Sequence, residues 1–137
     1  MKKIEWTPSL AVGIDSIDKQ HQELFRRIGD LLDACNEGHG QEAISEVLRF
    51  LENYVADHFG NEEKLMEKYQ YPDTMFHKGQ HVAFIDKFTE LKTKLEANGP
   101  SVPLVVGINI HVVKWLNDHI LRVDRLLGRF LQEKGVS

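Results

Sequence analysis

Apolar residues recur every three or four positions along most of the chain, which is the spacing of an α-helix with one buried face. Residues that break helices separate these periodic stretches, at Gly38-His39-Gly40, Tyr71-Pro72 and Asn98-Gly99-Pro100. The pattern therefore predicts four helices, over about residues 16–36, 41–69, 74–97 (after an N-cap at Asp73) and 103–134. No stretch shows the two-residue alternation of a β-strand.

Short connections between amphipathic helices make neighbouring helices antiparallel. We therefore predict an all-α fold, an antiparallel up-down-up-down four-helix bundle. Residues 1–15 lack this periodicity and are expected to lie across the bundle as an N-terminal arm, pinned by Trp6. At 137 residues the chain is expected to form a single domain, with the arm at 1–15 and the bundle at 16–134.

Seven polar side chains occupy positions where the apolar stripes predict hydrophobic ones. They are His21, His58, Glu62, His77, His81, His119 and Asp124. Burying one polar group without a partner costs a few kcal/mol. Seven such groups would exceed the total stability of a small domain, which is roughly 5–15 kcal/mol. A bound cation would compensate them, and we expect a metal.

The spacing of these residues directs them into one interior volume. His58 and Glu62 are four positions apart, as are His77 and His81, so each pair shares a helical face. His119 and Asp124 are five apart, about 140° around an ideal helix. Asp124 must therefore reach sideways, or the helix must be overwound or bulged there.

Ligand chemistry narrows the choice of metal. A structural zinc site takes four ligands, often thiolates, whereas the single cysteine, Cys35, continues an apolar stripe and is expected to be a small core residue. Calcium and magnesium prefer oxygen ligands. Two metals bridged by the carboxylates account for the whole set, and imidazole with carboxylate suits iron. Two iron ions are the best interpretation.

Charge and hydropathy exclude several other classes of function. Seventeen basic residues against 21 acidic ones give a net charge of −4 with no basic run, which argues against a nucleic-acid partner. No apolar run approaches the roughly 20 residues that span a bilayer, and the first residues lack the order of a signal peptide. The sequence thus predicts a cytoplasmic protein without a membrane span.

The ligand pattern identifies a resemblance. The order His21, His58-x-x-x-Glu62, His77-x-x-x-His81, His119-x-x-x-x-Asp124 resembles the full ligand signature of the hemerythrins. Features that resemble the single-domain bacterial hemerythrins (bacteriohemerythrins) are Trp6, Val12-Gly13-Ile14, Ile17-Asp18, His21-Gln22, Leu24-Phe25, His58-Phe59, Trp115-Leu116 and His119-Ile120. The resemblance covers essentially the whole chain.

The resemblance implies how the ligands are divided. His77, His81 and His119 would bind one iron, and His21 and His58 the other. Glu62 and Asp124 would bridge both irons, together with an oxo or hydroxo group. The iron with two histidines would then have five ligands and one position for dioxygen. The implied function is reversible dioxygen binding for transport, storage or delivery to an oxygen-consuming enzyme, by a monomer.

Apolar residues near that open position are expected to line an oxygen pocket. They are Leu24, Phe59, Trp115, Leu116 and Ile120, and ordinary core packing is the alternative interpretation for each. Asp18 and Gln20 are candidates for hydrogen bonds to a ligand imidazole. His111 is a weaker candidate for proton or gas access, and His39 is expected to be solvated.

Two other functional classes remain open. The protein could sense oxygen or redox state through a separate partner, or it could be an enzyme that handles peroxide or nitric oxide. Carboxylate-rich di-iron proteins of the ferritin-like type use paired Glu-x-x-His motifs, and this sequence contains none. We therefore expect a binding protein rather than an enzyme.

Overall fold

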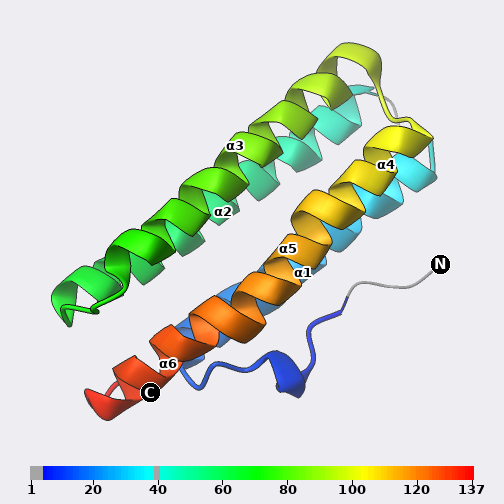
Figure 1. Cartoon of the computed structure of the whole chain (residues 1–137). Helices are drawn as coiled ribbons and strands as arrows, with labels where there is room; N and C mark the ends of the chain where they lie inside the picture. The colour runs from blue at the N-terminus through cyan, green and yellow to red at the C-terminus, as the bar shows by residue number, and fades with distance from the viewer. Residues whose placement is uncertain (1–4, 39–40) are drawn as a thin grey trace.

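Four long helices form the molecule (Figure 1). The structure, a computed structural model, describes residues 5–38 and 41–137, with side chains at all of these positions except 41–43. The first three helices are α1 (Asp15–Asn36), α2 (Gln41–Lys68) and α3 (Thr74–Asn98). The fourth helix is a continuous run of five segments, α4 (Val102–Ile108), η2 (Asn109–Lys114), α5 (Trp115–Asp118), η3 (His119–Asp124) and α6 (Arg125–Glu133). Each helix runs antiparallel to the one before it, so the predicted up-down-up-down bundle is confirmed.

The helices begin and end within two residues of the predicted positions. Gly99, with φ of 73°, follows the last residue of α3, a left-handed conformation that glycine adopts without a steric penalty. Asp73 does precede α3, but its side chain makes no capping hydrogen bond. The fourth helix is capped by Ser101, whose hydroxyl accepts a hydrogen bond from the Leu104 N–H.

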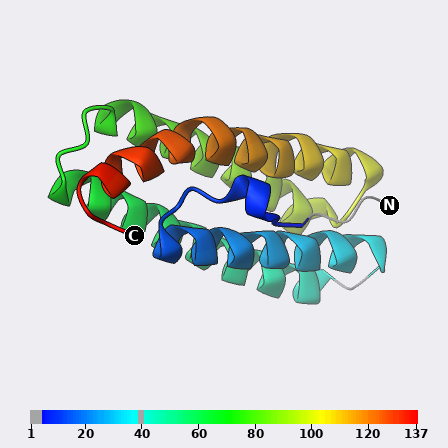
Figure 2. The ribbon, with the colours of Figure 1, turned by 90° about the horizontal axis from the view of Figure 1, so that it is seen from below.

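The N-terminal segment lies along the bundle between α1 and the fourth helix (Figure 2). It contains a short 3-10 turn, η1 (Pro8–Leu10), and three buried side chains, Leu10, Val12 and Ile14. Trp6 is partly buried against the same core, as predicted. The Asp18 carboxylate of α1 accepts hydrogen bonds from the Val12 and Gly13 N–H groups, at 2.8 and 3.3 Å. The described part of the predicted arm therefore packs on the bundle and contributes to the core, whereas residues 1–4 lie outside the described residues.

The core runs through the centre of the bundle and is apolar at both ends of the helices. Cys35 is buried among these side chains, as expected of a small core residue. None of the described helices combines the length and the apolar character needed to cross a bilayer. The apolar core is interrupted by buried histidines and carboxylates, nearer the end of the bundle at which α1 and α3 begin.

Candidate metal centre

All seven polar residues that interrupt the apolar stripes are buried, with 0 to 3% of their surface exposed. His21 comes from α1, His58 and Glu62 from α2, His77 and His81 from α3, and His119 and Asp124 from η3. The structure thus brings together every residue that the sequence singled out, with one contribution or more from each helix. We call these seven residues the histidine–carboxylate cluster.

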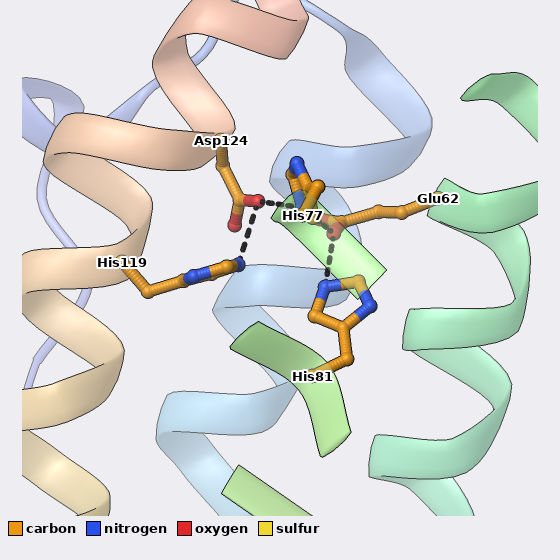
Figure 3. A group of neighbouring side chains, drawn as sticks. All are labelled: Glu62, His77, His81, His119 and Asp124. Atoms are coloured by element: carbon orange, nitrogen blue, oxygen red, sulfur yellow. Dashed lines mark hydrogen bonds and ion pairs between the residues drawn. The ribbon is translucent and has the colours of Figure 1, made fainter. Parts of the chain in front are cut away.

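The cluster divides into two overlapping groups. The three-histidine group contains Glu62, His77, His81, His119 and Asp124, and the two-histidine group contains His21, His58, Glu62 and Asp124. Within each group, one ligand atom from every residue lies within 4.8 Å of all the others. Figure 3 shows the three-histidine group, whose side chains point toward one another from α2, α3 and the fourth helix. Both carboxylates belong to both groups.

Each carboxylate turns one oxygen toward each group. The Asp124 Oδ1 atom lies 3.0 Å from the Nε2 atoms of His77 and His119, while Oδ2 lies 3.1 Å from Nε2 of His21. Glu62 behaves in the same way. Its Oε1 atom lies 3.1 Å from Nε2 of His77 and His81, and its Oε2 atom lies 3.1 Å from Nε2 of His58. This is the arrangement of two carboxylates that bridge neighbouring sites.

These contacts leave several buried atoms without a hydrogen bond of good geometry. Among them are Nε2 of His21 and His119, Oε2 of Glu62 and both oxygens of Asp124. These atoms lie close to one another, within 4.8 Å in each group. Ligands at right angles, each about 2.1 Å from a metal, lie about 3 Å apart, which matches the contacts between Nε2 and carboxylate oxygen. The residues therefore fit a cation in each group.

Electrostatics in the metal-free cluster lead to the same conclusion. Burial alone would lower the pKa of His21, but the close carboxylates of Asp124 and Glu62 outweigh it and raise that pKa to about 9. The same opposing effects raise the pKa of His77 to about 9. Burial would raise the pKa of Glu62, yet His58 and the hydrogen-bonded histidines hold it well below its usual value. The cluster thus attracts positive charge, whether from protons or from metal.

Hydrogen bonds outside the cluster orient two of the imidazoles. His58 donates from Nδ1 to Oε1 of Gln20 at 2.8 Å, and the same oxygen accepts from the Asn61 amide at 3.1 Å. His81 donates from Nδ1 to Oε2 of Glu63 at 3.0 Å. Of the two residues suggested for this role, Gln20 makes such a bond, whereas Asp18 binds the arm instead. Glu63 and Asn61 were not predicted, and the sequence marks them only by their positions on either side of Glu62.

A π-helical turn places Asp124 in the cluster. In η3 the backbone has the wider turn in which residues five apart lie one above the other. His119 and Asp124, its first and last residues, therefore face the same way despite their five-residue spacing. Of the three alternatives considered from the sequence, the bulged helix is correct. A second π-helical segment, η2, precedes it in the same helix and was not predicted.

Aromatic rings cover the three-histidine group. The Phe59 ring is stacked on His81, with centroids 3.8 Å apart and an interplanar angle of 4°. The Trp115 ring is stacked on His119 at 4.5 Å. The other three residues suggested for an oxygen pocket, Leu24, Leu116 and Ile120, are buried in the core.

Two histidines stand apart from this set. His111 is exposed on η2, outside the cluster. His39 lies outside the described residues.

The chain matches a family model described as the hemerythrin HHE cation binding domain over residues 12–131. The chain belongs to the hemerythrin family. Its relatives include bacteriohemerythrins of Pseudomonas aeruginosa (strain LESB58), 33% identical over 90% of this chain and 78% of that protein, and of Methylococcus capsulatus, 31% identical over 93% and 96%. A myohemerythrin of Theromyzon tessulatum is 30% identical over 88% of this chain and 87% of its own length.

Solved hemerythrin structures share this fold. The crystal structure of a wild-type hemerythrin superimposes with a TM-score of 0.83 and 30% sequence identity, and the match covers 95% of this chain and 98% of that one. Family membership and the buried cluster together establish a hemerythrin-type iron protein, as the resemblance implied.

Proposed function

We propose that this hemerythrin binds dioxygen reversibly at two non-haem irons joined by an oxo or hydroxo bridge, and that it transports, stores or delivers oxygen. His77, His81 and His119 would hold one iron, and His21 and His58 the other. Glu62 and Asp124 would hold both. The observation that carries the proposal is the division of each carboxylate, with one oxygen turned toward each group of histidines.

The two groups are unequal, and this inequality supports a binding role. With a shared bridge, the three-histidine group completes six ligands, whereas the two-histidine group supplies five. When bound, the iron pair supplies a vacant coordination position and the electrons that a reversible carrier lends to dioxygen. We therefore assign the vacant position, where dioxygen would bind, to the iron that His21 and His58 would hold.

The chain's own contribution is a dry surrounding. We propose that Leu24, Phe59, Trp115, Leu116 and Ile120 line the oxygen pocket, and four of these five side chains are buried. The Phe59 ring lies between the two groups, stacked on His81 and 5.8 Å from the His58 ring, whereas Trp115 is stacked on His119 of the three-histidine group. Excluding water and protons from the site favours return of the lent electrons over their loss. The described residues that could hold a metal include only two carboxylates beside five imidazoles, so little anionic charge is available to stabilise strongly oxidised iron. This composition favours a carrier over an enzyme.

One experiment tests the proposal. The purified protein is loaded with ferrous iron without oxygen, its iron content is measured, and its visible absorbance is followed as air is admitted and then removed under vacuum. We expect about two irons per chain and a visible band that appears with air and disappears under vacuum.

Two variants and two outcomes make the test specific. His58→Ala should abolish the band, whereas His111→Ala, which alters an exposed histidine outside the cluster, should leave it intact. Fewer than two irons, or turnover of peroxide or nitric oxide without a reversible band, would contradict the proposal.

A further inference from the structure

The two hydrogen bonds that orient cluster imidazoles from outside differ in charge. His81 donates to the carboxylate of Glu63, whereas His58 donates to the neutral amide oxygen of Gln20. Neither acceptor belongs to the cluster. Glu63 therefore adds a carboxylate to the three-histidine group, whereas the described residues place a neutral amide at the corresponding nitrogen of His58.

Glu63 lies partly in the solvent beside the cluster. Its side chain is 32% exposed, and one carboxylate oxygen accepts the His81 hydrogen bond. It is one of the residues that line a surface hollow of about 370 Å³ between α2 and α3, together with Phe59, His81 and Val82. Because Phe59 is stacked on the His81 ring, the ring is held in the plane in which Nδ1 faces Glu63 and Nε2 faces Glu62.

A carboxylate that accepts the outer N–H of a metal-bound imidazole makes that imidazole a stronger donor. A charged acceptor does so more than a neutral one, because charge-assisted hydrogen bonds are about twice as strong. Stronger donation favours the more oxidised state of the metal that the imidazole binds.

We propose that Glu63 is a positioning residue that acts through His81 to make the iron of the three-histidine group the more easily oxidised of the two. Gln20 leaves the iron of the two-histidine group harder to oxidise. This inference rests on the proposed di-iron function. It assigns to the residues around the cluster, rather than to the ligands alone, the electronic difference between the two irons.

The test compares three variants of the full-length, iron-loaded protein. Glu63→Gln removes the charge and keeps the shape of the acceptor, and Gln20→Glu adds a charge beside His58. Glu67→Gln is the matched control, because Glu67 lies one turn further along α2 and pairs with Lys78 rather than with an imidazole. Iron content and the ratio of oxidised to reduced protein at fixed potential are measured by spectroelectrochemistry.

We expect Glu63→Gln to keep two irons and to shift the ratio about tenfold toward the reduced form, equivalent to about 59 mV for a one-electron step. Gln20→Glu should shift it in the opposite direction, and Glu67→Gln should leave it within twofold of the original. A ratio unchanged in Glu63→Gln, or changed equally in Glu67→Gln, overturns the inference. If Glu63→Gln fails to fold or to take up iron, Gln20→Glu decides, and an unchanged ratio there overturns the inference.

A second measurement separates this inference from the proposed function. In the zinc-loaded protein, the ring N–H proton of His81 should give a downfield NMR signal that moves upfield in Glu63→Gln. If the wild-type protein binds no pair of irons, the proposed function is refuted. The NMR signal would still report the hydrogen bond between His81 and Glu63 in the zinc-loaded protein. Reversible oxygen binding by the wild-type protein, together with the same reduction potential in Glu63→Gln, would refute only the inference.

Discussion

Protons and metal ions compete for the same buried nitrogen atoms. Without metal, the neighbouring carboxylates raise the pKa of His21 and His77 to about 9, so both imidazoles are largely protonated at neutral pH. Burial and the charge of Glu62 would raise the pKa of Asp124, but the close imidazoles of His119 and His21 hold it far below its usual value. Metal uptake near neutral pH must therefore release protons.

The stability of the metal-free protein should depend on pH in a defined direction. His21 and His77 bind protons more tightly when folded than at their ordinary pKa of 6.5, so their stabilisation is present below pH 6.5 and is lost as the pH rises through about 9. The depressed pKa of Glu62 gives the opposite trend, a loss as the pH falls below its ordinary 4.5. We expect maximum stability between these limits, and a fall of at least about 1 kcal/mol between pH 6.5 and 9. Urea unfolding across this range measures it.

The zinc-loaded protein is the control for this experiment. Its ligand nitrogens are occupied by metal, so it should not lose stability between pH 6.5 and 9 through these histidines. Metal-free protein whose unfolding free energy stays level or increases over the same interval would show that protons do not replace the metal.

A polar group placed in the proposed oxygen pocket should shorten the life of the oxygenated form. Leu116→Asp introduces a carboxylate at a buried position of the fourth helix, where it brings water and protons toward the site. We expect autoxidation to be about tenfold faster, a barrier lower by about 1.4 kcal/mol. Stopped-flow absorbance of the oxygenated protein measures the decay. The control is Leu121→Asp, at a position 39% exposed on the same helix, and equal decay rates in the two variants would remove Leu116 from the pocket.

The fourth helix is the element whose local geometry matters most for the site. Its apolar periodicity predicts a helix, and a helix is present, but two π-helical segments interrupt the α-helical geometry. A π turn contains one extra residue and leaves the helix axis and the buried face almost unchanged. Periodicity averaged over many residues therefore detects it poorly. The ligand spacing of His119 and Asp124 marks η3, whereas no pair of ligands marks η2.

Shortening the π turn by one residue should preserve the fold and weaken the metal site. Deletion of Arg122, an exposed residue inside η3, leaves the two ligands four positions apart, the spacing that shares a face in an α-helix. We expect metal-free protein with a thermal midpoint near that of the original, but metal affinity lower by at least about tenfold, because the carboxylate shifts. Circular dichroism and competitive metal titration measure the two effects.

Deletion of Arg129 is the matched control. It lies in α6, where no extra residue exists to be lost, so its removal rotates the following residues, including the buried Leu131, by about 100°. The metal-free fold should be strongly destabilised. If the two deletions destabilise the metal-free fold equally, η3 does not contain an extra residue that the helix can lose without unfolding.

A site residue can be recognised in the sequence when its polarity differs from that expected at its position in the helix. All seven cluster residues could be found because each is polar at a position where the helix demands an apolar side chain. Glu63 could not, because a carboxylate at a partly exposed helical position is ordinary and spacing does not reveal its contact with His81. Asp18 was suggested for the wrong partner, since the sequence does not fix the path of the irregular arm that it binds.

At the scale of the molecule, the bundle is completed by the arm. The arm is hydrogen-bonded to α1 through Asp18 and to α6 through Arg125 and Gln132, so it joins the first and the last helix. The arm lies close to the helix backbone at Gly128, where a Cβ atom would lie 2.2 Å from the Val12 carbonyl oxygen. Glycine at this position lets the arm lie directly against the helix backbone.

A methyl group at this contact should displace the arm. Gly128→Ala places an atom where the Val12 carbonyl lies, and overpacking of this kind costs roughly 1–3 kcal/mol. We expect a loss of that size in the free energy of unfolding, measured by chemical denaturation. Gly79→Ala is the control, because nothing lies within 4 Å of the added atom in α3, and it should be neutral or stabilising by up to about 1 kcal/mol. Equal effects of the two substitutions would show that the arm is not tightly seated.

Burial of Leu10 has a practical consequence for the extent of the folding unit. The family match begins at residue 12, yet this leucine is part of the hydrophobic core and Trp6 packs against the same core. A version trimmed to the matched range would expose apolar surface along the groove between the first and last helices, and such surface promotes self-association. Expression designs and fusions should therefore keep the segment from Trp6 onward and attach any added sequence ahead of it.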